Sequence, residues 1–154
     1  NVTNMSYMFQ YCSGLTSLNL SGWDTSNVTS MNQFIYGSGK LNRVDGYISV
    51  KSLSKLNTLL YYYAKPNLYK ITFKDLGYNS NFTNFDMYYA TNWGVNSDTI
   101  TDARQSLIDS LITYSFDRAT NGYSTCTVTL ATNTKAVLTE DEIAQITAKG
   151  FTIA

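Results

Sequence analysis

Histidine is absent from this 154-residue sequence, and its absence removes a large part of enzyme chemistry. Histidine is the commonest general base, the commonest zinc ligand and the usual partner of a serine or cysteine nucleophile. Cysteine is also scarce, because Cys12 and Cys126 are the only two and cannot form a zinc box. We therefore expect a protein that is not an enzyme and that holds no metal or other cofactor.

Charge is scarce and balanced as well. The 11 basic and 11 acidic residues cancel, and charged residues make up 14% of the chain, against about 25% in a typical domain. Because no run of like charges occurs, we expect neither nucleic acid nor an anionic membrane as a partner. No stretch approaches the roughly 18 to 20 apolar residues of a membrane span, so membrane insertion is not expected either.

The carboxylates form no recognisable catalytic or metal-binding pattern. The acidic run at residues 140–142 fits the first turn of a helix, where the helix dipole favours negative side chains. The aspartates scatter along the chain without the spacing of a calcium-binding loop or of paired glycosidase carboxylates. An enzyme that acts on glycans through Asp45 or Asp86 is the alternative that these carboxylates leave open.

A repeat opens the chain. Residues 1–5 (NVTNM) return as residues 27–31 (NVTSM), which gives a period of 27 minus 1, or 26 residues. With this offset Leu18 maps to Val44. Residues 15–20 (LTSLNL) have the spacing L-x-x-L-x-L of a leucine-rich-repeat strand, in which the leucines point inward and the polar residues between them point outward.

Three later segments, residues 41–45, 68–73 and 82–87, repeat this alternation with larger side chains. Stacked in parallel, the four segments predict an α/β leucine-rich-repeat solenoid with short parallel strands on one face, helices and turns on the other, and a C-terminal cap. The outward polar side chains would form one strand face, and this face as a whole is the predicted ligand-binding surface. Any single position on it is more often a solvated strand residue than a ligand contact. Its predicted ligand-binding residues are Thr16, Asn19, Asn42, Arg43, Asp45, Tyr69, Lys70, Asn84, Asp86 and Tyr88, with Ser17, Thr72 and Thr83 on the same face.

The repeat unit resembles that of BspA-type bacterial surface proteins. Residues 1–9 (NVTNMSYMF), 12–21 (CSGLTSLNLS) and 22–31 (GWDTSNVTSM) follow that family's pattern, roughly W-D-T-S-N-V-T-x-M-x-x-M-F-x-x-C-x-x-L-x-x-L-x-L. The resemblance covers residues 1 to about 45. It implies a protein that is secreted or displayed on a bacterial surface and adheres to host components. Related repeats also occur on phage proteins, so the virion surface is the alternative location.

Outside the repeats, hydrophobic periodicity predicts three helices and two strands. The first helix is expected from Ser49 to Tyr62. The second is expected to run from an N-cap at Thr101, with an acidic first turn, to about Phe116. The third is expected to begin after Thr139, which opens a capping box. Residues 126–130 and 151–153 alternate as strands. The chain is thus divided into BspA-type repeats at 1–48, irregular leucine-rich-repeat units at 49–98 and helix-strand capping units at 99–154.

The N-terminal and cysteine positions add two expectations. No leader precedes Asn1, which already belongs to a repeat, so we expect the C-terminal part of a longer protein. In a stacked fold Cys12 and Cys126 lie several layers apart, beyond the roughly 7 Å between Cα atoms that a disulfide spans. Two free, buried thiols are predicted.

Tyrosine is the residue in marked excess, with 13 in the chain. Several gather between the second repeat and the cap, where they give contact area with little rotamer entropy and can stack on sugar faces. Tyr7 and Trp23, with Tyr61, Tyr62 and Tyr63, are instead expected to pack in the core.

The function predicted from these features is an extracellular module for binding or adhesion, whose partner is a host or cell-surface protein or glycan. The alternative is a structural or decoration component of a fibre, virion or surface layer. Self-association or assembly in a larger fibre is expected in either case, because the first strand has an open edge.

Overall fold

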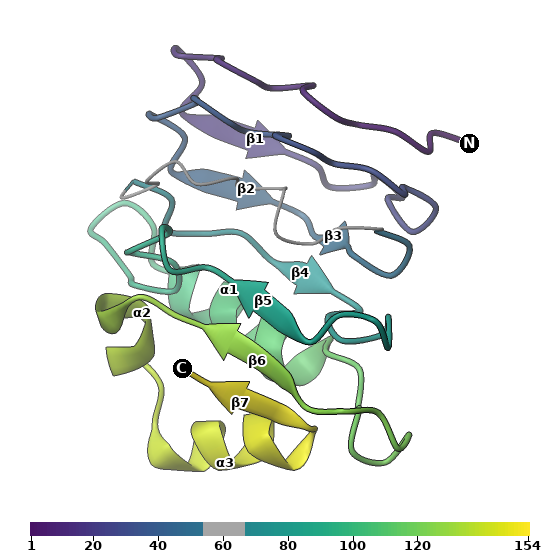
Figure 1. Cartoon of the computed structure of the whole chain (residues 1–154). Coiled ribbons are helices and arrows are strands. Elements are labelled where there is room, and N and C mark those ends of the chain that lie inside the picture. Colours follow the sequence, from purple (N-terminus) through teal and green to yellow (C-terminus); the bar gives the residue numbers. More distant parts are fainter. Residues whose placement is uncertain (54–66) are drawn as a thin grey trace.

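The computed structural model describes residues 1–53 and 67–154. All pairs between named strands are parallel, and the strands form the sheets β1-β2, β3-β4 and β5-β6-β7 (Figure 1). Within these ranges no helix is long and apolar enough to cross a membrane. The elements in chain order are β1 (Ser17–Asn19), β2 (Arg43–Asp45), β3 (Ile48–Ser49), β4 (Phe73–Lys74), β5 (Asn84–Asp86), α1 (Ala103–Ile108), the π-helix η1 (Asp109–Thr113), β6 (Cys126–Thr129), α2 (Thr132–Ala136), α3 (Glu140–Ala148) and β7 (Phe151–Ile153).

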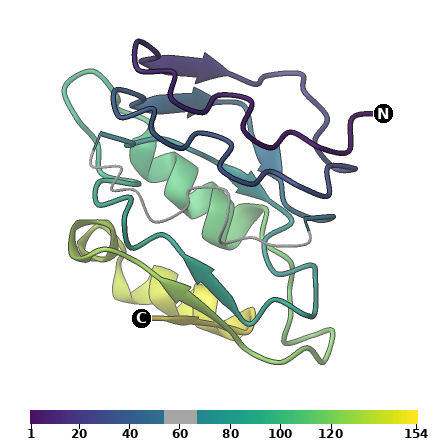
Figure 2. The same ribbon diagram turned by 45° about the horizontal axis from the view of Figure 1, so that its top comes forward.

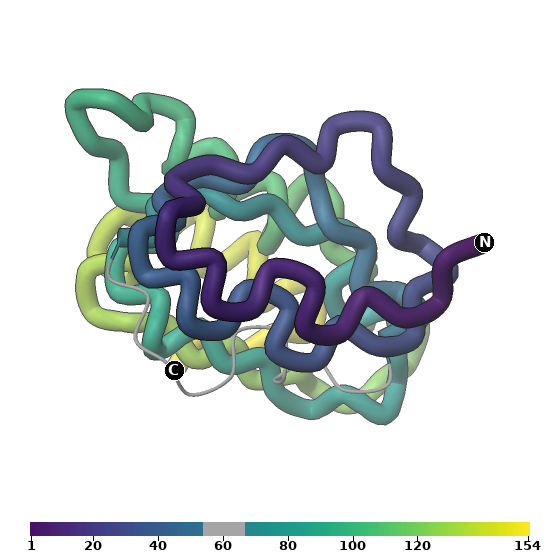
Figure 3. Tube along the Cα trace, turned by 90° about the horizontal axis from the view of Figure 1, so that it is seen from above, coloured from purple at the N-terminus to yellow at the C-terminus, as the bar shows by residue number. Residues whose placement is uncertain are grey.

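The 26-residue period sets the pairing of the first two passes of the chain. Leu18 of β1 pairs with Val44 of β2, as the sequence offset predicts, and the bridge between Asn4 and Ser30 has the same offset. Along the turn-rich side, the backbone N–H of Met5 donates to the Ser30 carbonyl at 2.9 Å. Successive passes therefore stack on one another through backbone hydrogen bonds. Seen from above, the first passes of the chain lie over one another (Figure 3).

The third pass continues this stack and then meets a helix. Arg43 bridges Lys70, and β4 follows three residues later. The hydroxyl of Ser110 in η1 accepts a hydrogen bond from the Phe73 N–H at 2.9 Å, and Asp75 N–H donates to the Tyr114 carbonyl at 3.0 Å. The α1–η1 helix thus takes the place that a fourth strand would occupy beneath β4.

The predicted fourth layer at residues 82–87 is a strand, but it does not follow the third. β5 pairs with β6 instead. The rings of Phe73 on β4 and Phe85 on β5 are both buried and meet edge to face with centroids 5.1 Å apart. Since both side chains point inward, the two strands face each other across the core. In Figures 1 and 2, α1 lies on the same side as β1 and β2, and the β5-β6-β7 sheet lies on the other.

Trp93 lies at the centre of the core, where the strands change from the side of β1 and β2 to the side of β5, β6 and β7. Its side chain is fully buried, and its Nε1–H donates to the Ile71 carbonyl at 2.8 Å. The indole also packs edge to face against Phe73 and Phe85, with centroids 5.8 and 6.2 Å away. One side chain therefore links the third pass, β5 and the connection to α1.

The C-terminal units are close to the prediction. Thr139 and Glu142 form the predicted capping box at the start of α3, and β6 and β7 lie within the predicted strand ranges. The acidic first turn predicted for the second helix is wrong. α1 begins after Asp102, which makes no side-chain capping bond because its carboxylate pairs with Lys70 at 2.5 Å.

The helix predicted from Ser49 is wrong at its beginning. Ser49 ends β3, and the Val50 N–H donates to the Lys74 carbonyl at 2.9 Å. The chain therefore pairs in parallel with β4 at these residues, although their hydrophobic spacing is helical. Leu53 is buried as part of this pass. Residues 54–62 of that predicted helix lie outside the described residues.

Both cysteines are free, as predicted, but only one is buried. Cys126 points into the core from β6, and burial raises the pKa of its thiol. Cys12 is half-buried, at a turn where its N–H donates to the Ser38 hydroxyl at 3.1 Å. The prediction of two buried thiols is therefore wrong for Cys12.

Replacing Trp93 should show how much its hydrogen bond to Ile71 contributes to the stability of the fold. Trp93→Phe keeps an aromatic ring but leaves the buried Ile71 carbonyl without its donor, so we expect the free energy of unfolding to fall by about 1–3 kcal/mol. Urea unfolding followed by circular dichroism measures this. The matched control is Trp23→Phe, which alters a side chain that is 40% exposed and should change stability by less than about 0.5 kcal/mol. Equal losses in the two variants would contradict the role given to Trp93.

Candidate binding groove

The structure divides the predicted strand face between two sides of the molecule. Thr16, Asn19, Asn42, Arg43, Asp45, Tyr69 and Lys70 lie on or beside the stack of β1, β2 and the Lys70 bridge, whereas Asn84, Asp86 and Tyr88 lie on or beside β5. A single ligand resting flat on one strand face cannot contact both groups. The prediction of one continuous face is therefore wrong, because α1 and not β5 continues the first stack.

A network of ion pairs neutralises the charges of the first group. Arg43 donates two hydrogen bonds to the Asp45 carboxylate, at 3.0 and 2.6 Å, and Lys70 Nζ lies 2.9 Å from Asp45 and 2.5 Å from Asp102. The hydrogen bonds from Arg43, followed by those from Lys70, lower the pKa of Asp45 from 3.8 to about 2. The charges of these side chains are therefore paired with one another.

Two other predicted ligand-binding residues accept hydrogen bonds from the backbone two residues further along the chain. The Asn19 side chain accepts from the Ser21 N–H at 2.8 Å, and the Asp86 carboxylate accepts from the Tyr88 N–H at 2.9 Å. Such local turns are common for Asn and Asp side chains. Thr72, which was predicted to face outward, is buried. Tyr88 remains 55% exposed, beside the ring of Tyr89.

Two aromatic residues predicted for the core are exposed instead. Tyr7 is 51% and Trp23 is 40% exposed. Both follow the repeat pattern but lie in turn-rich segments outside the strands. The Tyr7 N–H donates to the Asn32 carbonyl of the next pass at 2.9 Å, and the Trp23 N–H donates to the Leu20 carbonyl of its own turn at 2.9 Å. Tyr61, Tyr62 and Tyr63 lie outside the described residues.

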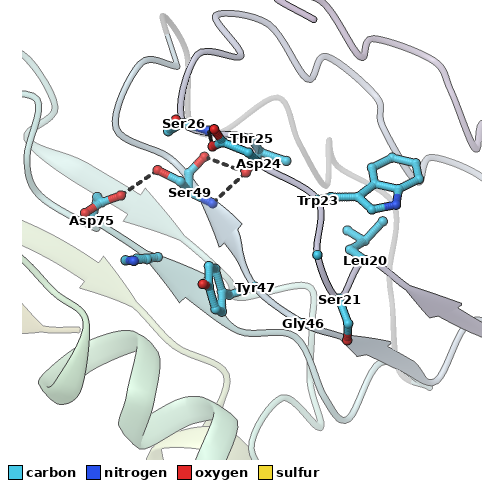
Figure 4. A pocket seen from close by; sticks show the side chains of 12 residues that line it. Leu20, Ser21, Trp23, Asp24, Thr25, Ser26, Gly46, Tyr47, Ser49 and Asp75 are labelled. Atoms are coloured by element: carbon cyan, nitrogen blue, oxygen red, sulfur yellow. Dashed lines mark hydrogen bonds between the residues drawn. The ribbon is translucent and has the colours of Figure 1, made fainter. Parts of the chain in front are cut away.

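Trp23 lines a cleft of about 400 Å³ on the side of the molecule where the strands end. The cleft is formed by three consecutive turns, one from each of the first three passes. In Figure 4, Trp23 and Asp75 lie at opposite ends, with Tyr47 and Ser49 between them. Its lining residues are Leu20, Ser21, Gly22, Trp23, Asp24, Thr25, Ser26, Gly46, Tyr47, Ser49, Lys74 and Asp75.

A column of polar side chains fixes the three turns relative to one another. The buried Thr25 hydroxyl accepts from the Ser49 N–H at 2.8 Å, and the Ser49 hydroxyl donates to the Asp75 carboxylate at 2.5 Å. Asp24, at the rim, accepts from the Ser26 hydroxyl and from the Ser26 N–H, and these bonds lower its pKa. The floor of the cleft is therefore preorganised.

Gly46 allows the first two turns to approach closely. Its φ is +81°, and a Cβ built there would lie 2.7 Å from the Ser21 nitrogen and 2.8 Å from the Leu20 carbonyl carbon. Any other residue would clash with the backbone of the preceding turn. The closeness of the two turns, and hence the shape of the cleft between them, depends on glycine at this position.

A second, smaller cleft of about 180 Å³ adjoins the first and shares Gly46 and Tyr47 with it. It extends the surface to α1, η1 and Tyr114, whose ring centroid lies 6.0 Å from that of Tyr47. We call the two clefts together the Tyr47 groove. The second cleft adds Lys70, Thr72, Asp102, Gln105, Ser106, Asp109 and Tyr114 to the lining.

Three large aromatic side chains stay exposed along this groove. Trp23 is 40%, Tyr47 45% and Tyr114 38% exposed. The Lys74 ammonium lies 5.0 Å from the centroid of the Tyr47 ring, which it holds through a cation–π contact. Of the residues predicted for the strand face, the groove contains only Lys70 and the buried Thr72 among its lining residues. The signal for it was in the turns, Gly22-Trp23 and Gly46-Tyr47, where an aromatic residue follows a glycine in two successive passes.

The groove offers hydrogen-bonding groups, but we find no metal-binding arrangement in it. Among residues 1–53 and 67–154, no group of three or more His, Cys, Asp or Glu side chains is placed to hold a metal ion. Asp24 and Asp75 are each bonded to a serine, as described above. The groove therefore presents aromatic faces, hydroxyl groups and a few charges to a ligand.

Comparison with known proteins finds a family match for part of the chain. Residues 1–72 match the family described as "Mycoplasma protein of unknown function, DUF285". This is a Mycoplasma domain family in the neighbourhood of BspA-like leucine-rich-repeat surface proteins. The matched segment includes Trp23 and Tyr47. None of the curated proteins and none of the solved structures compared with the chain matches it.

The ion-pair network should make stability depend on pH through Asp45. Because its pKa in the folded protein is about 2 and its usual value is 3.8, the carboxylate stabilises the fold above about pH 4 and loses this effect as the pH falls towards 2. We expect Asp45→Asn to lower the free energy of unfolding by about 1–2 kcal/mol at pH 7, after allowance for partial exposure, and by less at pH 3.

Urea unfolding at the two pH values tests this expectation. Asp98→Asn, at an exposed position in a bend, is the control and should have no effect at either pH. If Asp45→Asn destabilised the protein equally at pH 7 and pH 3, the loss would come from packing and not from the carboxylate charge.

Proposed function

We propose that the protein is an extracellular module for binding or adhesion, of the leucine-rich-repeat solenoid type, which presents the Tyr47 groove to a host or cell-surface protein or glycan. The observation that carries this proposal is the row of exposed aromatic side chains, Trp23, Tyr47 and Tyr114, along one groove. Tyrosine and tryptophan on a recognition surface give large contact area at low entropic cost, since they have few rotatable bonds.

The electrostatics favours the groove over the strand face as the contact surface. Arg43, Asp45 and Lys70 are engaged with one another and with Asp102, so a ligand would have to break existing ion pairs to use them. The aromatic side chains of the groove are 38–45% exposed, and a ligand can contact that exposed surface without breaking an ion pair. The proposed contact surface is therefore the groove and not the strand face beside it.

The proposed location rests on the first half of the chain. Its repeat resembles that of BspA-type surface proteins, and residues 1–72 match a family in the same neighbourhood. We accordingly propose a bacterial protein that is secreted or displayed on the cell surface, with the virion surface as the alternative. The proposal includes no catalytic step, and it gives the hydrogen bond between Ser49 and Asp75 a structural role in joining the turns.

One observation favours the structural alternative, in which copies of the chain assemble. The first pass has an apolar cleft of about 460 Å³, lined by Val2, Met5, Met8 and Trp23 among others, and Val2 and Met8 are 53% and 45% exposed. Exposed apolar surface of this kind suits contact with another protein surface. Sedimentation velocity over a range of concentrations would detect such assembly, and a constant monomer would count against it.

Removing two aromatic rings of the groove should abolish binding. We expect the double variant Tyr47→Ala and Tyr114→Ala to lose binding on an array of extracellular-matrix proteins and glycans, with affinity reduced by at least about tenfold. Tyr88→Ala with Tyr123→Ala is the matched control, because both tyrosines are exposed and neither lines the groove. Binding that survives in the groove variant and fails in the control would place the contact surface elsewhere.

A further inference from the structure

We infer that the Tyr47 groove is a saccharide-binding site, in which Trp23 and Tyr47 stack on the pyranose rings of a neutral oligosaccharide. This inference rests on the proposed function and specifies the ligand of the same groove. The ligand would be a neutral oligosaccharide, and the aromatic residues of the turns would hold its sugar rings.

The groove has the two kinds of surface that a sugar requires. A pyranose ring has faces of C–H groups, which pack on the electron-rich face of an aromatic ring, and a rim of hydroxyl groups, which need hydrogen-bond partners. Trp23 and Tyr47 lie at separate places along the larger cleft (Figure 4). Asp24 and Ser21 line the same cleft and are exposed, so they can bond to sugar hydroxyl groups.

The arrangement along the groove suits a chain of sugars. Tyr47 is shared by the two clefts, and Tyr114 lies beyond it in the second, with its ring 6.0 Å from that of Tyr47. The groove crosses the turns of three passes and reaches η1, so its aromatic rings follow one another along the stacking direction. The larger cleft, at about 400 Å³, falls in the usual range of about 300–1,000 Å³ for small-molecule sites.

The charge of the groove selects neutral sugars over acidic ones. Asp24, Asp75, Asp102 and Asp109 contribute four carboxylates to the lining, against the two ammonium groups of Lys70 and Lys74. Lys70 is paired with Asp45 and Asp102, and Lys74 lies over the Tyr47 ring. A sialylated or sulfated glycan would bring further negative charge to this excess of carboxylates.

The chain contains its own reporter for this site. It has two tryptophans, of which Trp23 is 40% exposed in the groove and Trp93 is fully buried. Acrylamide therefore quenches Trp23 fluorescence preferentially, and a sugar stacked on Trp23 protects it. In Trp23→Phe the remaining fluorescence comes from Trp93 alone.

The experiment titrates the soluble chain with neutral oligosaccharides that end in galactose, N-acetylglucosamine, glucose or mannose, beside sialylated and sulfated counterparts. We expect at least one neutral oligosaccharide to protect Trp23 from acrylamide. Tyr47→Ala should weaken that binding by about tenfold or more, Tyr47→Phe should retain it, and the control Tyr88→Ala should leave it unchanged. The near-ultraviolet circular dichroism of Trp93 checks that each variant is folded.

The possible results separate this inference from the proposed function. If the chain binds matrix proteins through Tyr47 but no oligosaccharide, the saccharide inference is overturned and the proposed function stands. A preference for acidic glycans, or sugar binding that Tyr47→Ala leaves intact, overturns the inference as well. Absence of binding to every protein and oligosaccharide tested overturns both.

Discussion

The hydrogen bond from the Trp93 indole to the Ile71 carbonyl marks the point on which the rest of the structure depends. A buried carbonyl without a donor is costly, and the only group that reaches this one among the hydrogen bonds of the described residues is the indole N–H. The same ring fills the space between Phe73 and Phe85. Through this contact the strands of the first half and those of the second half share one core while facing opposite sides.

This change of sides explains where the groove lies. Beyond the third pass, the wall that β1 and β2 begin is continued by α1 and η1, which bring Asp102 and Tyr114 next to Lys70 and Tyr47. The strand face thereby gains a carboxylate that completes its ion pairs. The aromatic side chains along the groove, Trp23, Tyr47 and Tyr114, remain partly exposed to solvent.

The C-terminal units are fixed to the first half by a buried cation as well as by apolar packing. Arg118 has no exposed surface, and its guanidinium donates to the carbonyls of Ser124, Gly77 and Asn79 at distances from 2.6 to 3.2 Å. A buried charge is tolerated when its hydrogen bonds are satisfied. Arg118 thus joins the turn after β4 to the loop before β6, two segments that the sequence separates widely.

The sequence alone determined the local features of this protein. The 26-residue offset predicted the pairing of Leu18 with Val44, and the Thr139 capping box predicted the start of α3, because both depend on short-range spacing. The strand at residues 82–87 was also predicted, but its partner was not, since β5 pairs with β6 and not with the preceding pass. Only the tertiary structure decided that Asp102 would pair with Lys70 and that Trp23 would be exposed. Strand periodicity fixes which side chains point inward. The segment that covers each layer is decided by packing between segments that are distant in the sequence. Because α1 and η1 cover the third pass, the groove lies along the turns.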